Sequence, residues 1–323
     1  MFGIHAVAPG LVQLTLAAPQ GVGLPFGFPQ NVFVLGAGSN RAVVGSGPRG
    51  ARSSLLAALD AAGVRPTDVT RVVLTAALPE SLGNVEVFER AAVVAAADAP
   101  LQPQAVAAAV RAELEPIARD LCRGPERHPD WDERQVDAFF DAYAAGLPAH
   151  LDVVAAPDGA ELAAGDVVLE LLASPGVCAH AACFVERQRG WLFTGPTMTT
   201  TPEPRLRDPR AYTDSVAQVS QLTPRLILPG TGGVERAYFH FFRSTNLAVS
   251  NLVSNMPFAL HGPTAVAHVA YRDVGYWPRD VIRFAAWIWR FKVVLDELVA
   301  SGVAAVEGEG AWARYTMDRP PRA

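Results

Sequence analysis

The segment Cys178-Ala-His-Ala-Ala-Cys brings two thiols and one imidazole close together in the chain. Thiolates and imidazoles are common zinc ligands, and a thiol or hydroxyl beside a histidine can form a nucleophile–base pair. The catalytic candidates on this basis are Ser81, Cys178 and His180. The competing interpretation is structural: residues 181–184 are typical of a strand, on which His180 and Cys183 would point to opposite faces.

A glycine-rich turn offers a different chemistry. Residues 45–50 read Gly-Ser-Gly-Pro-Arg-Gly after a short strand and before a helix, which is the context of a dinucleotide-binding turn. Two features oppose this function, because no acidic residue ends the next strand and Pro48 is unusual inside the motif. Anion binding by the backbone at the helix N-terminus stays open as an alternative.

The densest aromatic segment of the chain is Tyr238-Phe-His-Phe-Phe-Arg243. One interpretation is a helix or strand packed beneath a site. The other is the wall of a ligand pocket, formed by Tyr238 and His240, with Arg243 as the anchor for an anion.

The elements that would position these residues alternate between strand and helix. Residues 11–16 alternate as in a half-buried strand, and residues 31–36 and 42–47 are short β-branched runs that end in glycine. Residues 49–64 carry apolar side chains at helical spacing and predict a helix, and residues 71–75 indicate another buried strand. This order predicts a βαβ unit.

The second half of the chain adds helices to this pattern. Residues 101–150 carry two helical patterns and predict a helical insertion, and strands return after it with a turn at Pro157-Asp158-Gly159. Residues 182–195 predict a hairpin, and 225–233 a last strand that reaches a glycine-rich loop. The chain from Pro278 to about Val306 is predicted to be helical, with an apolar stripe that packs on the body of the protein or on a partner subunit. A candidate strand follows it, in the segment Glu-Gly-Ala-Trp-Ala-Arg-Tyr-Thr-Met.

Taken in order, these segments resemble the metallo-β-lactamase fold superfamily, from about residue 10 to residue 233. The matching segments are 30–35, 43–47, 65–84, 161–184, 192–197 and 229–232. The resemblance implies an αββα sandwich over residues 1–270, with the insertion near 101–150 and a C-terminal helical extension, 271–323, packed on the same domain.

The resemblance also implies a site for one or two metal ions, which are held in that family by histidines and aspartates of the matching motifs. The corresponding positions here are Gly45, Ala76, Leu78, Glu80, Ser81, Val177, Pro196 and Thr231. Only Glu80 keeps a carboxylate, and aliphatic side chains cannot coordinate a metal. The inherited metal site is therefore predicted to be absent.

The composition limits the remaining function classes. A net charge of −5 and a pI near 5.8 argue against a nucleic-acid-binding protein. No apolar run reaches the roughly 18 residues of a membrane helix, and the N-terminus lacks the pattern of a signal peptide. Three scattered cysteines do not suggest a disulfide framework, so a cytoplasmic location is expected.

The sequence thus predicts a pseudoenzyme without metal or other cofactor, which binds a small apolar ligand or a partner protein. The ligand pocket would lie at the former metal positions Ala76, Leu78, Glu80, Ser81, Val177, Pro196 and Thr231. A metal-independent pathway enzyme is an extension of this hypothesis. The alternative is a hydrolase of lactonase or thioesterase type with a relocated active site, and a homodimer formed through the C-terminal helices is a further expectation.

Overall fold

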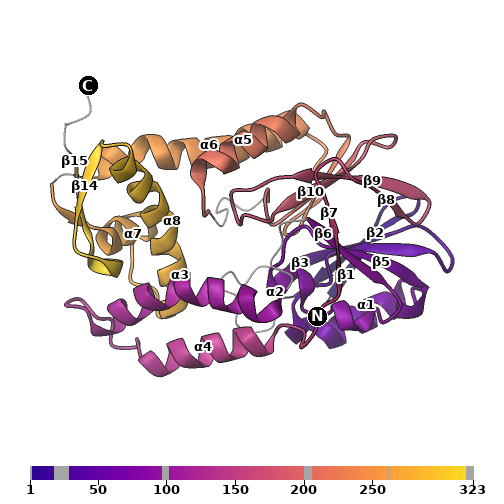
Figure 1. Ribbon diagram of the computed structural model, residues 1–323, viewed down its shortest axis with the longest axis horizontal. Helices are drawn as coiled ribbons and strands as arrows, with labels where there is room; N and C mark the ends of the chain where they lie inside the picture. Colours follow the sequence, from indigo (N-terminus) through magenta and orange to yellow (C-terminus); the bar gives the residue numbers. More distant parts are fainter. Residues whose placement is uncertain (1, 18–28, 97–101, 200–205, 261, 318–323) are drawn as a thin grey trace.

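Two β-sheets fill one half of the protein, on the right in the computed structural model drawn in Figure 1, and the C-terminal helices lie on the left. The structure describes residues 2–17, 29–96, 102–199, 206–260 and 262–317. The first sheet follows chain order and consists of β1 (Phe2–Ala8), β2 (Leu11–Leu16), β3 (Gln30–Leu35), β4 (Arg41–Val44), β5 (Val69–Val73), β6 (Ala92–Ala96) and β7 (Val153–Ala156). Strands β1 to β4 pair antiparallel, and β4 to β7 pair parallel.

The second sheet has the order β12-β11-β10-β9-β8. Its strands are β8 (Glu161–Ala164), β9 (Val167–Ala173), β10 (Ala182–Glu186), β11 (Trp191–Gly195) and β12 (Leu226–Pro229). The predicted hairpin is confirmed, because β10 and β11 pair antiparallel with Phe184 opposite Phe193. The predicted turn at residues 157–159 joins β7 of the first sheet to β8 of the second.

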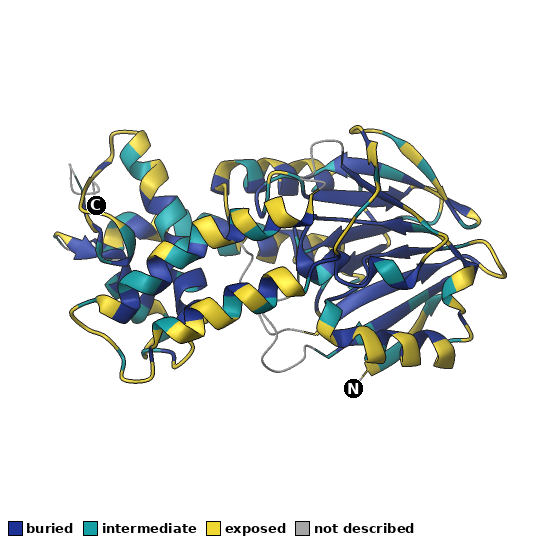
Figure 2. Cartoon of the chain, turned by 60° about the horizontal axis from the view of Figure 1, so that its bottom comes forward, coloured by how far each residue is buried: buried dark blue, intermediate teal, exposed yellow. Residues whose placement is uncertain are grey.

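Alternating side chains of the buried strands build a layered core. In β3, Val32 and Val34 pack with helix α1 (Arg52–Ala61), whereas Phe33 and Leu35 pack with residues of the second sheet. The outer face of the second sheet is covered by α5 (Pro209–Ser220). Strands buried on both faces are expected where helices cover both sides of a sandwich, and Figure 2 shows this burial. The arrangement is the αββα sandwich predicted from the sequence.

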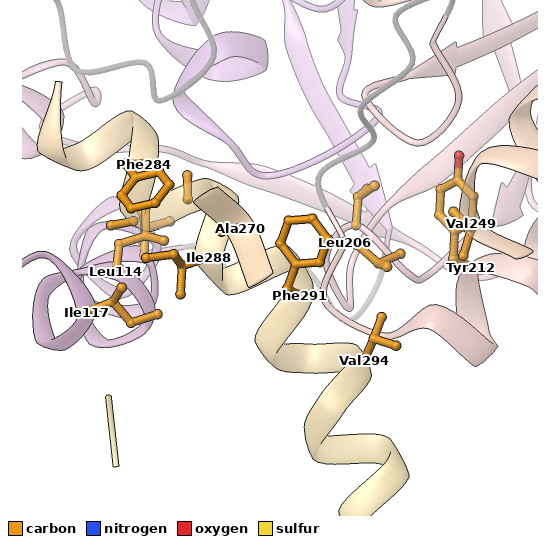
Figure 3. Packing of buried hydrophobic residues seen from close by; sticks show 14 of the residues in the cluster. Leu114, Ile117, Leu206, Tyr212, Val249, Ala270, Phe284, Ile288, Phe291 and Val294 are labelled. Carbon is orange, nitrogen blue, oxygen red and sulfur yellow. The ribbon is translucent and has the colours of Figure 1, made fainter. Parts of the chain in front are cut away.

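The predicted helical insertion is present as α3 (Pro103–Arg123) and α4 (Glu133–Ala145). Helix α3 packs along α8 (Val281–Ala300), and Leu114 and Ile117 lie against Phe284 and Ile288 (Figure 3). Trp131, in the connection between α3 and α4, stacks on Phe284 with ring centroids 5.7 Å apart. The Trp131 Nε1–H donates to the carbonyl oxygen of Pro278 at 2.8 Å, which fixes the insertion to the C-terminal part.

The C-terminal part differs in one respect from the helical extension expected after residue 271. A long helix already begins at Tyr238, and the chain after α8 forms a hairpin that completes a small three-stranded sheet. The elements are α6 (Tyr238–Ala259), β13 (Thr264–Ala265), α7 (Val266–Val274), α8, β14 (Ala304–Glu307) and β15 (Arg314–Met317). Gly302, with φ at +71°, allows the turn out of α8 that a purely helical reading misses. The candidate strand at the end of the chain is confirmed as β15.

The apolar stripe of α8 is buried against the same chain, as predicted for core packing. Short helical turns complete the structure: η1 (Arg49–Ala51), η2 (Pro66–Asp68), α2 (Pro79–Leu82), η3 (Val85–Val87) and η4 (Gly310–Trp312). Within the described ranges, no helix has both the length and the apolar character that a membrane crossing requires.

Candidate functional site

Loops that follow four strands meet at one edge of the sandwich. They begin at Gly45 after β4, Thr75 after β5, Gly195 at the end of β11 and Gly230 after β12. Because β4 and β5 run parallel, and β11 and β12 run parallel, the loops at their carboxyl ends come together. They enclose a cavity of 20 Å³ lined by Gln30, Asn31, Phe33, Val44, Gly45, Thr75, Glu80, Ser81, Gly195, Pro196, Leu228 and Gly230. A cavity of this volume holds about one water molecule.

Close backbone contact gives this edge its geometry. The Gly230 N–H donates to the carbonyl oxygen of Gly195 at 2.8 Å. Gly195 has φ at +53°, and a Cβ atom at this position would lie 2.1 Å from the Thr75 Oγ1. A side chain at residue 195 is therefore excluded both by the backbone conformation and by the lack of space.

Asn31 ties β3 to the last of these loops. Its Nδ2 donates to the carbonyl oxygens of Pro229 at 2.9 Å and Gly232 at 2.8 Å, and its backbone N–H donates to Gly230 O at 2.8 Å. The side chain is 7% exposed. Asn31 lies in a segment that resembles a family motif, but the motif match alone assigns it no function. The signal in the sequence was a pair of amide side chains, Gln30 and Asn31, at the start of an otherwise apolar strand.

Hydrogen bonds to neighbouring segments hold the glycine-rich turn in place. The Gly45 N–H donates to Val73 O, and the Ser46 N–H donates to Ser81 O. The fully buried Asn84 Nδ2 donates to the carbonyl oxygens of Ser46, Gly47 and Pro48, at 3.1, 3.2 and 2.7 Å. Phosphate binding needs backbone N–H groups that point toward the ligand. The first two N–H groups of this turn are used inside the protein, which favours a structural role over a dinucleotide site.

The structure brings part of the predicted ligand pocket together. Three of the seven predicted pocket residues, Glu80, Ser81 and Pro196, line the 20 Å³ cavity, and so does Gly45, which corresponds to a metal position outside the predicted pocket. The other former metal positions are buried without lining it: Ala76, Leu78, Val177 and Thr231 have exposed fractions of 1%, 4%, 1% and 8%. Side chains at most of these positions are therefore part of the packed interior.

The donors at this edge do not fit a metal ion. Among the residues that line the cavity, Glu80 supplies the one carboxylate, and the remaining polar side chains are amides and hydroxyls. Zinc, iron and manganese sites in proteins use several imidazole, thiolate or carboxylate ligands around one point. Across the described parts of the chain, no group of three or more His, Cys, Asp or Glu side chains is arranged to hold a metal.

The cysteines and the histidine of the 178–183 segment lie in different environments. Cys183, on β10, is fully buried on the outer face of the second sheet, and burial raises the pKa of its thiol to about 12. Cys178 and His180 are half-buried in the turn before β10. The strand begins at Ala182, so His180 precedes it and the predicted opposition of the two faces does not apply. Ser81 lies at the cavity instead, on α2.

The aromatic segment forms the beginning of α6, which settles the choice between helix and strand. Tyr238 and Arg243 line a hollow between α5 and α6, and neither residue is among those that line the cavity described above. His240 is exposed and lines neither space.

No family model and no curated protein matches this sequence. Solved structures do resemble it. A metallo-β-lactamase family protein from Thermus thermophilus has a TM-score of 0.76 at 20% identity, over 97% of this chain and 100% of its own. A β-lactamase domain protein from Burkholderia ambifaria has a TM-score of 0.71 at 15% identity, over 97% and 94%. A metallo-β-lactamase from Pontibacter korlensis has a TM-score of 0.53 at 14% identity, over 78% and 100%.

The first two similarities extend over the insertion and the C-terminal part as well as over the sandwich, since they cover nearly the whole chain. Together with the layer order and the loops that meet at the sheet edge, they identify the architecture. This chain has the metallo-β-lactamase fold.

Proposed function

We propose that this protein is a pseudoenzyme, which keeps the metallo-β-lactamase frame and acts by binding a small apolar ligand or a partner protein. The observation that carries the proposal is the chemistry of the donor set. Glu80 is the one carboxylate at the former metal positions, and Ala76, Leu78 and Val177 are buried aliphatic side chains. Metal-activated water needs ligands that these side chains cannot supply.

The dimensions of the cavity limit how a ligand would use it. A volume of 20 Å³ accommodates a group of about the size of a water molecule. A ligand would therefore insert only a small end between Thr75, Glu80 and Ser81. The rest of the molecule would contact the surface around the cavity.

Cysteine content and net charge bear on where the protein acts and what it binds. The three cysteines are free thiols, which supports a reducing cytoplasm. The formal charge of −5 gives no support to nucleic-acid binding. The homodimer remains a prediction, which sedimentation at micromolar concentration tests.

The experiment is a hydrolysis assay with a lactone, a thioester and a β-lactam, each with and without added zinc, manganese and iron(II). The proposal expects no rate above background that depends on any of these metals. A rate that appears on adding a metal, and is removed by a chelator, would overturn it.

The same assay separates the alternative hydrolase with a relocated active site. A rate that persists without metal, and is lost in the Ser81→Ala, Cys178→Ala or His180→Ala variant, would favour that hydrolase. A matched control is Cys122→Ala, because Cys122 is a buried thiol on α3 and is not among the residues that line the cavity.

A further inference from the structure

A hollow of 270 Å³ lies between α5 and α6. Val216 and Ala217 line it from α5, and Tyr238, Phe239 and Phe242 line it from α6. Phe239 is 69% exposed and Tyr238 is 37% exposed, whereas aromatic rings of this size are usually mostly buried. The hollow therefore presents flat apolar surface to the solvent.

One cation completes the lining. Arg243 is exposed, and within the described part of the chain its guanidinium makes neither an ion pair nor a hydrogen bond. Other arginines are paired: Arg119 contacts Glu115 at 2.6 Å, and Arg187 contacts Glu170. An unpaired guanidinium beside aromatic rings suits an anion carried on a flat apolar body.

The lining adds no charge that opposes Arg243. The hollow has no acidic side chain in its lining, and the first turn of α6 contains no acid. The N-cap of α6 is Ala237, which makes no side-chain hydrogen bond, so the positive end of this helix is not neutralised by a capping side chain. A negative charge at Arg243 would therefore meet no opposing carboxylate from the lining.

We propose that this hollow is a binding site for a small organic carboxylate with an aromatic or similarly flat apolar body. The apolar body would lie against Phe239 and Phe242, and the carboxylate would accept hydrogen bonds from the Arg243 guanidinium. The hollow shares no lining residue with the 20 Å³ cavity, so the proposal does not depend on the function proposed for that cavity.

The test compares 2-naphthoate with its neutral analogue 2-naphthamide by isothermal titration calorimetry on the full chain. We expect saturable binding of one naphthoate per chain, and about tenfold weaker binding of the amide because the charge-assisted hydrogen bonds are lost. In the Arg243→Met variant the preference for the carboxylate should disappear. In the Ala217→Trp variant, which fills the hollow from an exposed position, both ligands should fail to bind.

The matched control is Arg283→Met, which removes an exposed arginine of α8 outside the hollow and should leave both affinities unchanged. Circular dichroism of each variant reports whether the fold is kept. Absence of saturable naphthoate binding would overturn the proposal. So would an unchanged carboxylate preference in Arg243→Met, or unchanged affinity in Ala217→Trp.

Discussion

Replacing Leu78 or Val177 by alanine tests whether apolar packing has taken the place of a metal centre. Leu78 is 4% exposed and Val177 is 1% exposed, and Val177 belongs to the large cluster on the outer face of the second sheet. Removing a buried leucine side chain costs about 2–4 kcal/mol of unfolding free energy. Removing the two methyl groups of valine costs about 1.6 kcal/mol in transfer energy, and the cavity left behind raises this to about 2–3 kcal/mol.

The assay is equilibrium unfolding in urea, followed by circular dichroism and by tryptophan fluorescence. Matched controls are Leu56→Ala and Val168→Ala, since Leu56 is 40% exposed and Val168 is 49% exposed. Each control should change the unfolding free energy by less than about 0.5 kcal/mol.

The difference expected between the buried positions and the exposed controls reflects a trade-off between chemistry and packing. Metal-ligand positions are selected for chemistry and contribute little to packing, whereas core positions stabilise the fold. If Leu78→Ala and Val177→Ala destabilise the protein no more than their exposed controls, these positions are not part of the core and the reasoning fails.

Three further predictions concern other contacts. Asn84→Ala should lower the unfolding free energy, measured in urea, by about 2–4 kcal/mol, because buried carbonyl groups of the glycine-rich turn lose their donor. A decrease of less than about 0.5 kcal/mol would contradict this. Trp131→Phe keeps the stacking on Phe284 and removes the hydrogen bond to Pro278, so hydrogen exchange in the α3–α4 connection should become faster, and unchanged exchange would refute the role given to that bond. Burial raises the pKa of the Cys183 thiol to about 12, whereas a cysteine in the unfolded chain titrates near 8.5. The contribution of this neutral thiol to the unfolding free energy is therefore fully present below about pH 8.5 and is lost as the pH rises toward about 12. Urea midpoints of Cys183→Ala should fall less steeply over this range than those of the natural protein, and equal slopes would contradict the assignment.

Much of the fold follows from local patterns. Short β-branched runs such as 31–36 and 71–75, together with glycine turns, lie at or close to the observed strands β3 and β5, and helical periodicity located α3 and α4. The spacing of apolar side chains over a few neighbouring residues is enough to predict these strands and helices.

The parts that could not be predicted depend on contacts between distant segments. The contact of α3 with α8 and the hydrogen bond from Trp131 to Pro278 join residues far apart in the chain. Periodicity gives each helix an apolar face and does not identify the element that covers it. For the same reason the sequence placed Tyr238 and Arg243 at the wall of the former metal pocket as a hypothesis, whereas they line a separate hollow.

The residue types at the candidate site can be read from the sequence, whereas the dimensions of its cavity cannot. The loss of ligands at residues such as Ala76 and Val177 is visible in the sequence, because residue type alone decides whether a side chain coordinates a metal. The small volume of the cavity cannot be read from residue types. It depends on how closely the loops approach one another, through the hydrogen bond of Asn31 to Pro229 and the contact of Gly195 with Thr75.

The most direct test of the central claim is the metal content of the full chain, measured by mass spectrometry after purification without chelators or a histidine tag. The loss of ligands at the former metal positions predicts less than about a tenth of an equivalent of zinc, iron or manganese per chain. About one equivalent or more of any of them would contradict the account, and the side chains of Glu80, Cys178 and His180 would be the first to replace in search of the ligands.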